Sequence, residues 1–251
     1  MSSAVAKVFK ALKNPEKLSV FLRGRLLPKD GEGTRMCSWV YGELPRLKVT
    51  EVIPGIRDVN VEIHRAFDRK IETSIDAYEV FVLCSIVKSV GAKRILEIGT
   101  FDGNTALNLA ANTPPDAHVT TIDLPPDWQG GLELDVPDAM VNVTKRDKVG
   151  AQFRDSSFAG KITQVFGDSA QLDWSALPGP FDVVFIDGCH FYDYVKKDTA
   201  NALQHLRPGG LVIWHDYGMI RDVSRAVDET ATRIEVKAVR GTRFAIGFKR
   251  D

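Results

Sequence analysis

Residues 94–105 read RILEIGTFDGNT, and this short stretch decides the fold class of the chain. It begins with a continuously apolar run, 94–98, which is typical of a strand buried on both faces of a sheet. Gly99 and Gly103 follow, and glycines permit a tight turn in which backbone segments approach closely. A helical pattern then covers residues 104–111. The stretch therefore predicts a strand, a turn and a helix, which together make one unit of a parallel α/β sheet.

The same alternation of apolar runs and helical patterns continues to the end of the chain. Such an order predicts a mostly parallel sheet with helices on both faces. The last two runs are separated by Gly241 and suit a hairpin, which adds antiparallel pairing. We expect a Rossmann-like sheet of seven strands, and we expect residues 207–210 (RPGG) to end a helix. The predicted strands are 94–98, 118–123, 162–166, 181–187, 211–216, 234–239 and 244–248, and the predicted helices are 75–90, 104–111, 147–158, 192–206 and 223–232.

The composition excludes several classes of protein. The chain has 251 residues, with 33 basic and 33 acidic side chains, and this balance argues against bulk attraction to nucleic acid or to an acidic membrane. No run of about 18 apolar residues is present, so no membrane-spanning helix is expected. The first 15 residues lack the continuous apolar core of a secretory signal. The three cysteines are scattered, which fits a reducing compartment, and we expect a cytoplasmic protein.

The balanced charge hides an uneven distribution along the chain. Residues 1–29 contain seven basic residues and one acidic residue, which leaves the remainder with an acidic excess. Residues 30–60 are rich in glycine and proline and predict loops with short strands. We therefore divide the chain into an N-terminal cap, 1–73, and a larger α/β domain, 74–251. The basic segment predicts an amphipathic cap helix, which could contact a second copy of the chain; a membrane-surface or partner-docking helix is the alternative.

Ligands of open α/β sheets bind outside the carboxyl ends of the strands, so the residues that follow each strand are candidate site residues. Gly99 and Gly103 have GxxxG spacing and precede a helix N-terminus, which suits a carboxylate or phosphate. Asp123 ends the next strand, where an acidic residue can accept hydrogen bonds from both ribose hydroxyls. Asp168 and Ser169 follow the third strand, and they either reach an adenine edge or cap the next helix. Together these ends predict a site for a nucleoside-containing cofactor.

The next two strand ends carry acidic and imidazole side chains. Asp187 ends one predicted strand, and His215 and Asp216 end the neighbouring one. Two carboxylates and an imidazole are suitable ligands for a divalent metal. His190 would lie in the loop above Asp187, where a neutral imidazole could take a proton from a substrate hydroxyl. The alternative is hydrogen-bonded scaffolding without a metal.

These motifs resemble those of class I S-adenosylmethionine-dependent methyltransferases, and the resemblance covers residues 74–248. The stretch 96–103 (LEIGTFDG) is similar to the cofactor motif of the catechol-type members. The stretches 185–192 (FIDGCHFY), 206–210 (LRPGG) and 215–216 (HD) look like those of small-molecule O-methyltransferases. The metal-dependent members of that group include catechol-type and macrolide-sugar enzymes.

The resemblance implies roles for the cofactor-binding residues. Glu97 and Gly99 would face the methionine end of S-adenosylmethionine, and Thr105 would help to hold its carboxylate. Asp123 would hold the ribose. The full predicted set is Glu97, Gly99, Thr100, Phe101, Gly103, Thr105, Asp123, Asp168 and Ser169.

The resemblance also implies that Asp187, His215 and Asp216 bind Mg²⁺ and that His190 is the general base. The chain departs from the family at His215, where the Mg²⁺ enzymes usually carry a carboxylate. A histidine ligand favours Mn²⁺, Fe²⁺ or Zn²⁺, and it also leaves open a site without metal.

The connection 124–146 is long for a compact domain and contains Trp128, which could cover the cofactor or the acceptor or could pack locally. We predict an O-methyltransferase of secondary metabolism that acts on a hydroxyl of a natural product, sugar or phenol. The alternatives are a metal-independent methyltransferase, a nicotinamide-dependent oxidoreductase and a non-catalytic docking module. The GxxxG spacing counts against the oxidoreductase.

Overall fold

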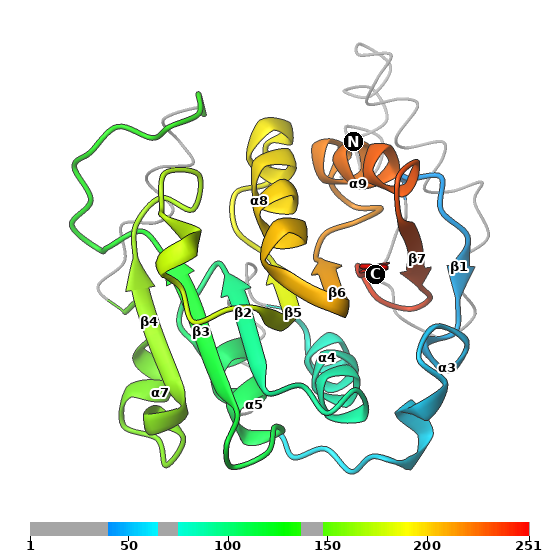
Figure 1. Ribbon diagram of the computed structural model, residues 1–251, viewed down its shortest axis with the longest axis horizontal. Helices are drawn as coiled ribbons and strands as arrows, with labels where there is room; N and C mark the ends of the chain where they lie inside the picture. The colour runs from blue at the N-terminus through cyan, green and yellow to red at the C-terminus, as the bar shows by residue number, and fades with distance from the viewer. Residues whose placement is uncertain (1–39, 65–74, 137–147, 251) are drawn as a thin grey trace, which may run out of the picture.

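A computed structural model describes residues 40–64, 75–136 and 148–250 of the chain (Figure 1). These residues form one sheet of eight strands in the order β1-β7-β8-β6-β5-β2-β3-β4. All neighbouring strands are parallel except β8, which runs antiparallel between β6 and β7. The predicted Rossmann-like, mostly parallel sheet with an antiparallel C-terminal hairpin is therefore confirmed.

The sheet has one strand more than the seven predicted. The additional strand is β1, which has two residues and pairs in parallel with β7 at the sheet edge. It lies within residues 30–60, where loops with short strands were expected, but two residues are too few to show the alternation that would give a strand its bounds. The strands are β1 (Arg46–Leu47), β2 (Arg94–Ile98), β3 (His118–Asp123), β4 (Ile162–Phe166), β5 (Phe181–Ile186), β6 (Leu206–Trp214), β7 (Glu235–Val239) and β8 (Ala245–Phe248).

Strand β6 begins earlier than predicted. The preceding helix does end at His205, but the RPGG segment then continues directly into β6 without a loop. The backbone N–H of Gly209 donates to the carbonyl of Lys249, and the N–H of Lys249 donates to the carbonyl of Gly210, each at 3.0 Å. These two hydrogen bonds to Lys249, close to the C-terminus of the described chain, hold the glycines in the sheet. A pattern within residues 207–210 could not predict them.

Four of the five predicted helices lie where expected, with ends that differ by at most two residues. The predicted helix over 147–158 is wrong, because the described part of it contains only the single turn α7. Gly150 has a left-handed conformation (φ 71°) just before α7, and the hydroxyl of Ser156 donates to the carbonyl of Phe153 at 2.7 Å, in competition with a helical bond. The helical segments are α3 (Val49–Val52), η1 (Pro54–Asp58), α4 (Ala77–Ser89), α5 (Asn104–Ala111), α7 (Ala151–Arg154), η2 (Ala159–Lys161), η3 (Trp174–Ala176), α8 (Tyr192–His205) and α9 (Arg221–Ala231).

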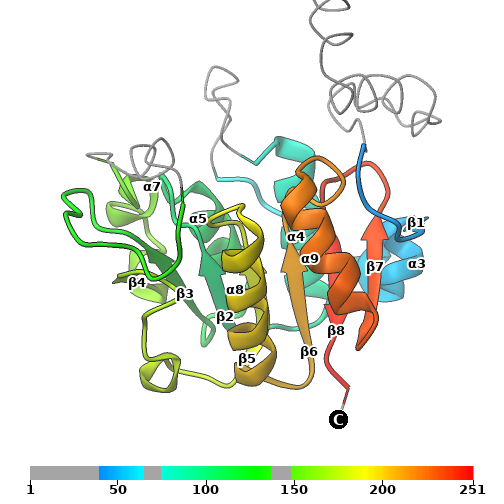
Figure 2. The same ribbon diagram turned by 90° about the horizontal axis from the view of Figure 1, so that it is seen from above.

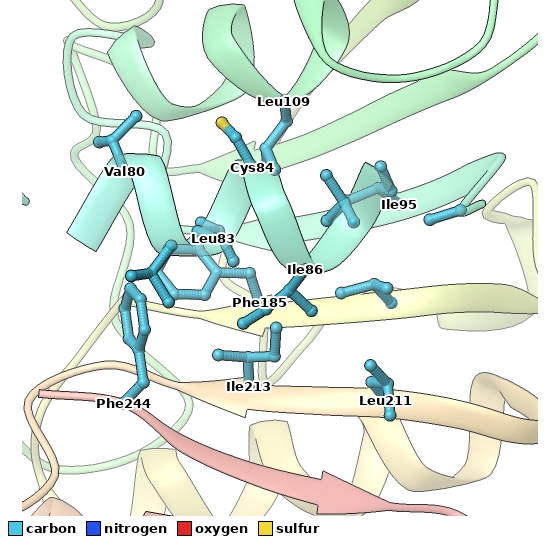
Figure 3. Packing of buried hydrophobic residues seen from close by; sticks show 14 of the residues in the cluster. Val80, Leu83, Cys84, Ile86, Ile95, Leu109, Phe185, Leu211, Ile213 and Phe244 are labelled. Atoms are coloured by element: carbon cyan, nitrogen blue, oxygen red, sulfur yellow. The ribbon is translucent and has the colours of Figure 1, made fainter. Parts of the chain in front are cut away.

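Helices cover both faces of the sheet, with α8 and α9 on one face and α4 and α5 on the other (Figure 2). Successive residues of β5 point to opposite faces, so Val183 and Phe185 belong to one core cluster and Val184 and Ile186 to the other. Figure 3 shows the first cluster, in which side chains of α4 pack on β5 and β6. This packing fixes α4 beside the strands whose ends carry the candidate site.

The described part of the predicted cap, residues 40–64, belongs to the same core as the predicted α/β domain, 74–251. Val52, Ile53 and Ile56 are buried in the cluster that contains α4. The backbone N–H groups of Val40 and Tyr41 donate to the carbonyl of Gly218 at 2.8 and 3.0 Å. The predicted basic helix and the predicted boundary near residue 74 lie outside the described residues. None of the described helices combines the length with the apolar composition that crossing a bilayer requires.

Candidate active site

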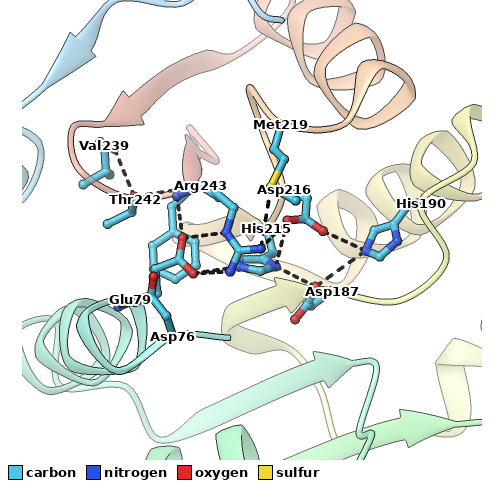
Figure 4. Close-up of polar contacts among 11 residues, drawn as sticks. Asp76, Glu79, Asp187, His190, His215, Asp216, Met219, Val239, Thr242 and Arg243 are labelled. Atoms are coloured by element: carbon cyan, nitrogen blue, oxygen red, sulfur yellow. Dashed lines mark hydrogen bonds and ion pairs between the residues drawn. The ribbon is translucent and has the colours of Figure 1, made fainter. Parts of the chain in front are cut away.

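The carboxyl ends of β2, β3, β5 and β6 meet at one edge of the sheet, because these strands are parallel. Two groups of side chains lie there. The first, which we call the cofactor half, follows β2, β3 and β4 and contains the nine residues predicted to bind the cofactor. The second, which we call the acidic cluster, follows β5 and β6 and consists of Glu79, Asp187, His190, His215, Asp216 and Arg243 (Figure 4).

The turn after β2 can be built only with glycine at two positions. Gly99 has φ 102°, and a Cβ atom there would lie 2.1 Å from the backbone oxygen of Asp187. Gly103 has φ 87°, and a Cβ atom there would lie 2.5 Å from the ring of Phe153. The N–H of Phe101, between them, donates to Asp123 Oδ2 at 2.8 Å. The turn is therefore tied to Asp123 on one side and adjoins the acidic cluster on the other.

Glu97 lies at the base of this turn and is fully buried. Its Oε2 accepts a hydrogen bond from Thr121 Oγ1 at 2.5 Å, and Thr121 Oγ1 lies 2.7 Å from Thr100 Oγ1. Burial, together with the nearby carboxylates of Asp187 and Asp123, raises the pKa of Glu97 well above its usual range. Its Oε1 has no hydrogen-bond partner among the described residues. A buried acceptor of this kind fits an N–H group of a ligand bound against the turn.

Further residues of the cofactor half lie in α5 and after β4. Thr105 lies partly exposed in the first turn of α5. Asp168 accepts hydrogen bonds from the N–H of Ala170, the hydroxyl of Tyr194 and the N–H of Glu133, at 2.9, 2.8 and 2.8 Å. The first of these bonds closes a turn and does not cap a helix, because the next helical segment, η3, is capped by Asp173. The other two connect Asp168 to Tyr194 of α8 and to Glu133. A cofactor contact of Asp168 stays a prediction.

The described part of the long connection after β3 contains Trp128. A Cβ atom on Gly130 would lie 2.7 Å from the indole, so this ring packs on its own loop. Its Nε1 is buried and has no hydrogen-bond partner among the described residues. The local packing agrees with the simpler of the two predicted roles, and a covering role for Trp128 stays a prediction.

Asp187, His190 and Asp216 converge on one point in the acidic cluster. His190 Nε2 lies 3.1 Å from Asp216 Oδ2 and 3.8 Å from Asp187 Oδ1. One ligand atom from each residue lies within 4.8 Å of the others, a spacing that could hold a metal ion. Burial alone would lower the pKa of His190, but the two carboxylates raise it to about 9. Without a cation, His190 is therefore a protonated partner of both carboxylates.

His215 lies beneath this point and is buried. Its Nδ1 lies 2.8 Å from Asp187 Oδ1 and its Nε2 lies 3.1 Å from Glu79 Oε2, so both ring nitrogens are occupied. Burial opposes its charge, but the carboxylates raise the pKa of His215 to about 10. The structure thus brings the three predicted metal ligands together, but the imidazole that faces the convergence point is His190.

Glu79 and Arg243 belong to the cluster and were not predicted as site residues. Arg243 donates to Glu79 from Nε at 3.1 Å and from Nη2 at 2.6 Å, and from Nη1 to Asp216 at 2.8 Å. Burial disfavours the Glu79 carboxylate, but His215 and Arg243 lower the pKa of Glu79 to about 2. A signal for Glu79 is present in the sequence, because it lies on the same helical face as the buried Leu83 and Ile86. Arg243 gives no comparable signal.

Residues 96–217 match a family model described as a methyltransferase domain. This part of the chain is a methyltransferase domain. Its fold is that of the class I S-adenosylmethionine-dependent methyltransferases, as the resemblance implied. TomG from Streptomyces achromogenes, an O-methyltransferase solved in complex with SAM, aligns with a TM-score of 0.53 at 19% identity. The alignment covers 83% of this chain and 92% of TomG.

Two curated relatives share part of the sequence of the methyltransferase domain. The catechol O-methyltransferase of Niastella koreensis is 27% identical over 158 residues, which are 62% of this chain and 62% of that protein. The demethylmacrocin O-methyltransferase of Streptomyces fradiae is 36% identical over 73 residues, 27% of this chain and 18% of that protein. The chain spans about three fifths of the length of the curated relatives that match its longest stretches.

The matched span of the methyltransferase domain contains every residue predicted for the site, from Glu97 to Asp216. It does not contain Glu79 or Arg243. Segments on either side of the matched span therefore contribute Glu79 and Arg243 to the acidic cluster.

Proposed function

We propose that the chain is an S-adenosylmethionine-dependent O-methyltransferase that methylates a hydroxyl of a small molecule with the help of a divalent cation. The observation that carries this proposal is the contact between the two halves of the site. Gly99 of the cofactor turn lies against the backbone oxygen of Asp187, so a cofactor on the turn and an acceptor at the acidic cluster would be neighbours. Such proximity is the main requirement of a direct group transfer.

The cofactor half offers a polar group for each part of the cofactor. Glu97 Oε1 would accept from the amino group of the methionine portion, and the first turn of α5, with Thr105, would bind its carboxylate. Asp123 would accept from the ribose hydroxyls. Asp168 and Ser169 would border the adenine. When bound, S-adenosylmethionine supplies an electrophilic methyl group on a sulfonium centre.

The acidic cluster fits a divalent cation through Asp187, His190 and Asp216. In this proposal His190 replaces His215 in the predicted ligand set, because both nitrogens of His215 are already occupied. A cation there would lower the pKa of an acceptor hydroxyl. The imidazole favours Mn²⁺, Fe²⁺ or Zn²⁺ over Mg²⁺.

The ion pair of His190 supports a second candidate, a metal-independent methyltransferase in which His190 is the base. The 3.1 Å contact with Asp216 orients the imidazole as a base requires. With a pKa of about 9, however, His190 must first lose its proton, so this enzyme would gain activity as the pH rises towards 9. The two candidates therefore differ in chelator sensitivity and in pH dependence.

The acceptor class rests on the relatives and on the composition. The names catechol O-methyltransferase and demethylmacrocin O-methyltransferase support a hydroxylated small molecule, such as a phenol, sugar or natural product of secondary metabolism. The described cysteines, Cys84 and Cys189, are unpaired, which supports the predicted reducing, cytoplasmic location. A homo-oligomer formed through the N-terminal segment stays a prediction.

Isothermal titration calorimetry with S-adenosylhomocysteine and with NAD tests the cofactor. We expect binding of the first and none of the second, and the reverse would overturn the proposal. Transfer of a labelled methyl group to catechols, sugars and an extract of the source organism then tests the reaction by mass spectrometry. We expect labelled ethers, loss of activity with a chelator and recovery with Mn²⁺. Full activity in excess chelator would favour the metal-independent candidate.

A further inference from the structure

A buried group of charged side chains lies beneath the convergence point of the acidic cluster. It consists of Glu79, His215 and Arg243, which we call the anchor triad. We propose that the anchor triad positions the carboxylates of Asp187 and Asp216 for cation binding. This inference rests on the cation site of the proposed function and adds residues that do not themselves face the cation.

Each of the two site carboxylates is held by one member of the triad. His215 Nδ1 donates to Asp187 Oδ1 at 2.8 Å, and Arg243 Nη1 donates to Asp216 Oδ1 at 2.8 Å. The other oxygen of Asp216, Oδ2, is the atom that lies 3.1 Å from His190. One oxygen of Asp216 is therefore fixed from below while the other faces the convergence point. Hydrogen bonds of this kind set the orientation of metal-ligating groups.

Glu79 links the two donors. It accepts from Nε and Nη2 of Arg243 and from Nε2 of His215, and the backbone N–H of Arg243 adds a bond of 2.6 Å to Glu79 Oε1. The Glu79 side chain has no exposed surface, and Asp76 caps the helix that carries it by accepting the Glu79 N–H at 2.9 Å. Without the Glu79 carboxylate, the buried, positively charged side chains of Arg243 and His215 would lose the acceptor that fixes their orientation.

The rest of the surroundings leave His215 little freedom to turn. The rings of Phe185 and Phe244 pack against the imidazole, with centroids 6.2 and 5.6 Å from its own, and against each other at 5.9 Å. Both rings belong to the apolar core, which is closely packed. Glu79 and Arg243 come from helix α4 and from the turn before β8, so the triad connects both flanks of the matched domain to its site.

A purely structural role for Glu79 would lower stability without changing the cation site. The matched control for this possibility is Asp182→Asn. Asp182 lies on β5, the strand that leads to Asp187, but at its opposite end. There its carboxylate accepts hydrogen bonds from the backbone N–H groups of Lys93 and Arg94, each at 2.8 Å. Its loss should destabilise the fold without reaching the acidic cluster.

The experiment measures Mn²⁺ affinity of the full chain by electron paramagnetic resonance, with S-adenosylhomocysteine affinity measured in parallel by calorimetry. We expect Glu79→Gln to raise the Kd for Mn²⁺ by roughly 10- to 100-fold and to leave S-adenosylhomocysteine binding unchanged. Arg243→Lys keeps the charge but loses the bidentate fork, and it should give a smaller increase. This variant also serves if Glu79→Gln does not fold. Asp182→Asn should leave the Kd for Mn²⁺ unchanged.

Each outcome decides the proposal. Unchanged Mn²⁺ affinity in folded Glu79→Gln or Arg243→Lys overturns it, as does an equal loss in Asp182→Asn. A wild-type chain that binds S-adenosylhomocysteine but no Mn²⁺ also overturns it, while the methyltransferase proposal stands. A chain that binds Mn²⁺ but no S-adenosylhomocysteine contradicts the proposed function instead, and the comparison of variants still tests the triad.

Discussion

The two halves of the site are assembled in different ways. In the cofactor half, Glu97 and the glycine turn come from one short stretch, and Asp123 follows in the next strand. The acidic cluster collects Glu79, Asp187, His215 and Arg243 from segments separated by most of the described chain. The part of the cofactor half that comes from one βα unit can be recognised as a local motif, whereas a cluster built from four segments exists only when the sheet has formed.

The halves also differ in how their charges are satisfied. Burial and neighbouring carboxylates raise the pKa of Glu97, and one of its oxygens has no partner among the described residues. In the acidic cluster, imidazole and guanidinium groups lower the pKa of Glu79, Asp187 and Asp216 against the effect of burial. In the cofactor half, a bound ligand could supply the hydrogen-bond donor that Glu97 Oε1 lacks. In the acidic cluster, His190 must lose its proton before its imidazole can bind a cation.

The largest expected effect comes from removing the charge of Asp187, which should impair the acidic cluster and leave the cofactor half intact. Asp187→Asn keeps the side-chain shape but removes a carboxylate that His190 and His215 share. We expect the turnover number to fall on the order of 10³-fold, because the acceptor oxygen loses its cation. The Kd for S-adenosylhomocysteine should stay unchanged, as calorimetry can measure. A comparable loss of S-adenosylhomocysteine binding would show that the two halves are not separable.

A second prediction concerns the contact that joins the halves. Gly99→Ala places a Cβ atom against the backbone of Asp187 in a conformation with positive φ, so the turn must shift. We expect a loss of about 3 kcal/mol in the free energy of unfolding, together with weaker binding of both S-adenosylhomocysteine and Mn²⁺. Urea unfolding measures the first effect.

Gly160→Ala is the control for this substitution. Its φ is not positive and no atom lies within 4 Å of the added Cβ, so stability should change little. If Gly99→Ala were as stable as Gly160→Ala, the close approach of the two halves would not hold.

The smallest effect on the site itself is expected for a carboxylate that belongs to neither half, because its charge bears on stability rather than on ligand binding. Burial and Asp168 raise the pKa of Asp198 to about 7, although a contact with Ser169 lowers it in part. A raised pKa means that the folded state holds this proton more tightly than the unfolded state. Between about pH 4 and pH 7, rising pH therefore removes up to ~1.4 kcal/mol of stability per pH unit, with no further loss above pH 7.

Asp198→Asn should remove this slope and leave the ligand affinities of both halves unchanged. Urea unfolding of the wild type and the variant at pH 4, 5, 6, 7 and 8 measures the difference between their stabilities. A difference that does not vary over this range would contradict the raised pKa.

Most of the fold could be predicted because its central strands, such as β2 and β5, are mostly apolar and largely buried, and helical patterns separate them. Strands β2, β3 and β4 have the predicted bounds. One error falls where a distant segment decides the outcome, because pairing with Lys249 draws the RPGG segment into β6. The other has a local cause, because Gly150 and Ser156, inside the predicted helix 147–158, limit α7 to one turn.

The sequence by itself determined the strand ends, and with them the placement of Glu97, Asp123, Asp187 and Asp216 at one edge, because side-chain periodicity and glycine spacing are local properties. The tertiary structure alone decided which imidazole faces the acidic pair and which lies beneath it. Packing of α4 against β5 and β6 brings Glu79 to His215 and Arg243. A buried charged side chain is stable only beside a group of opposite charge, and the fold can bring that group from more than a hundred residues away in the sequence.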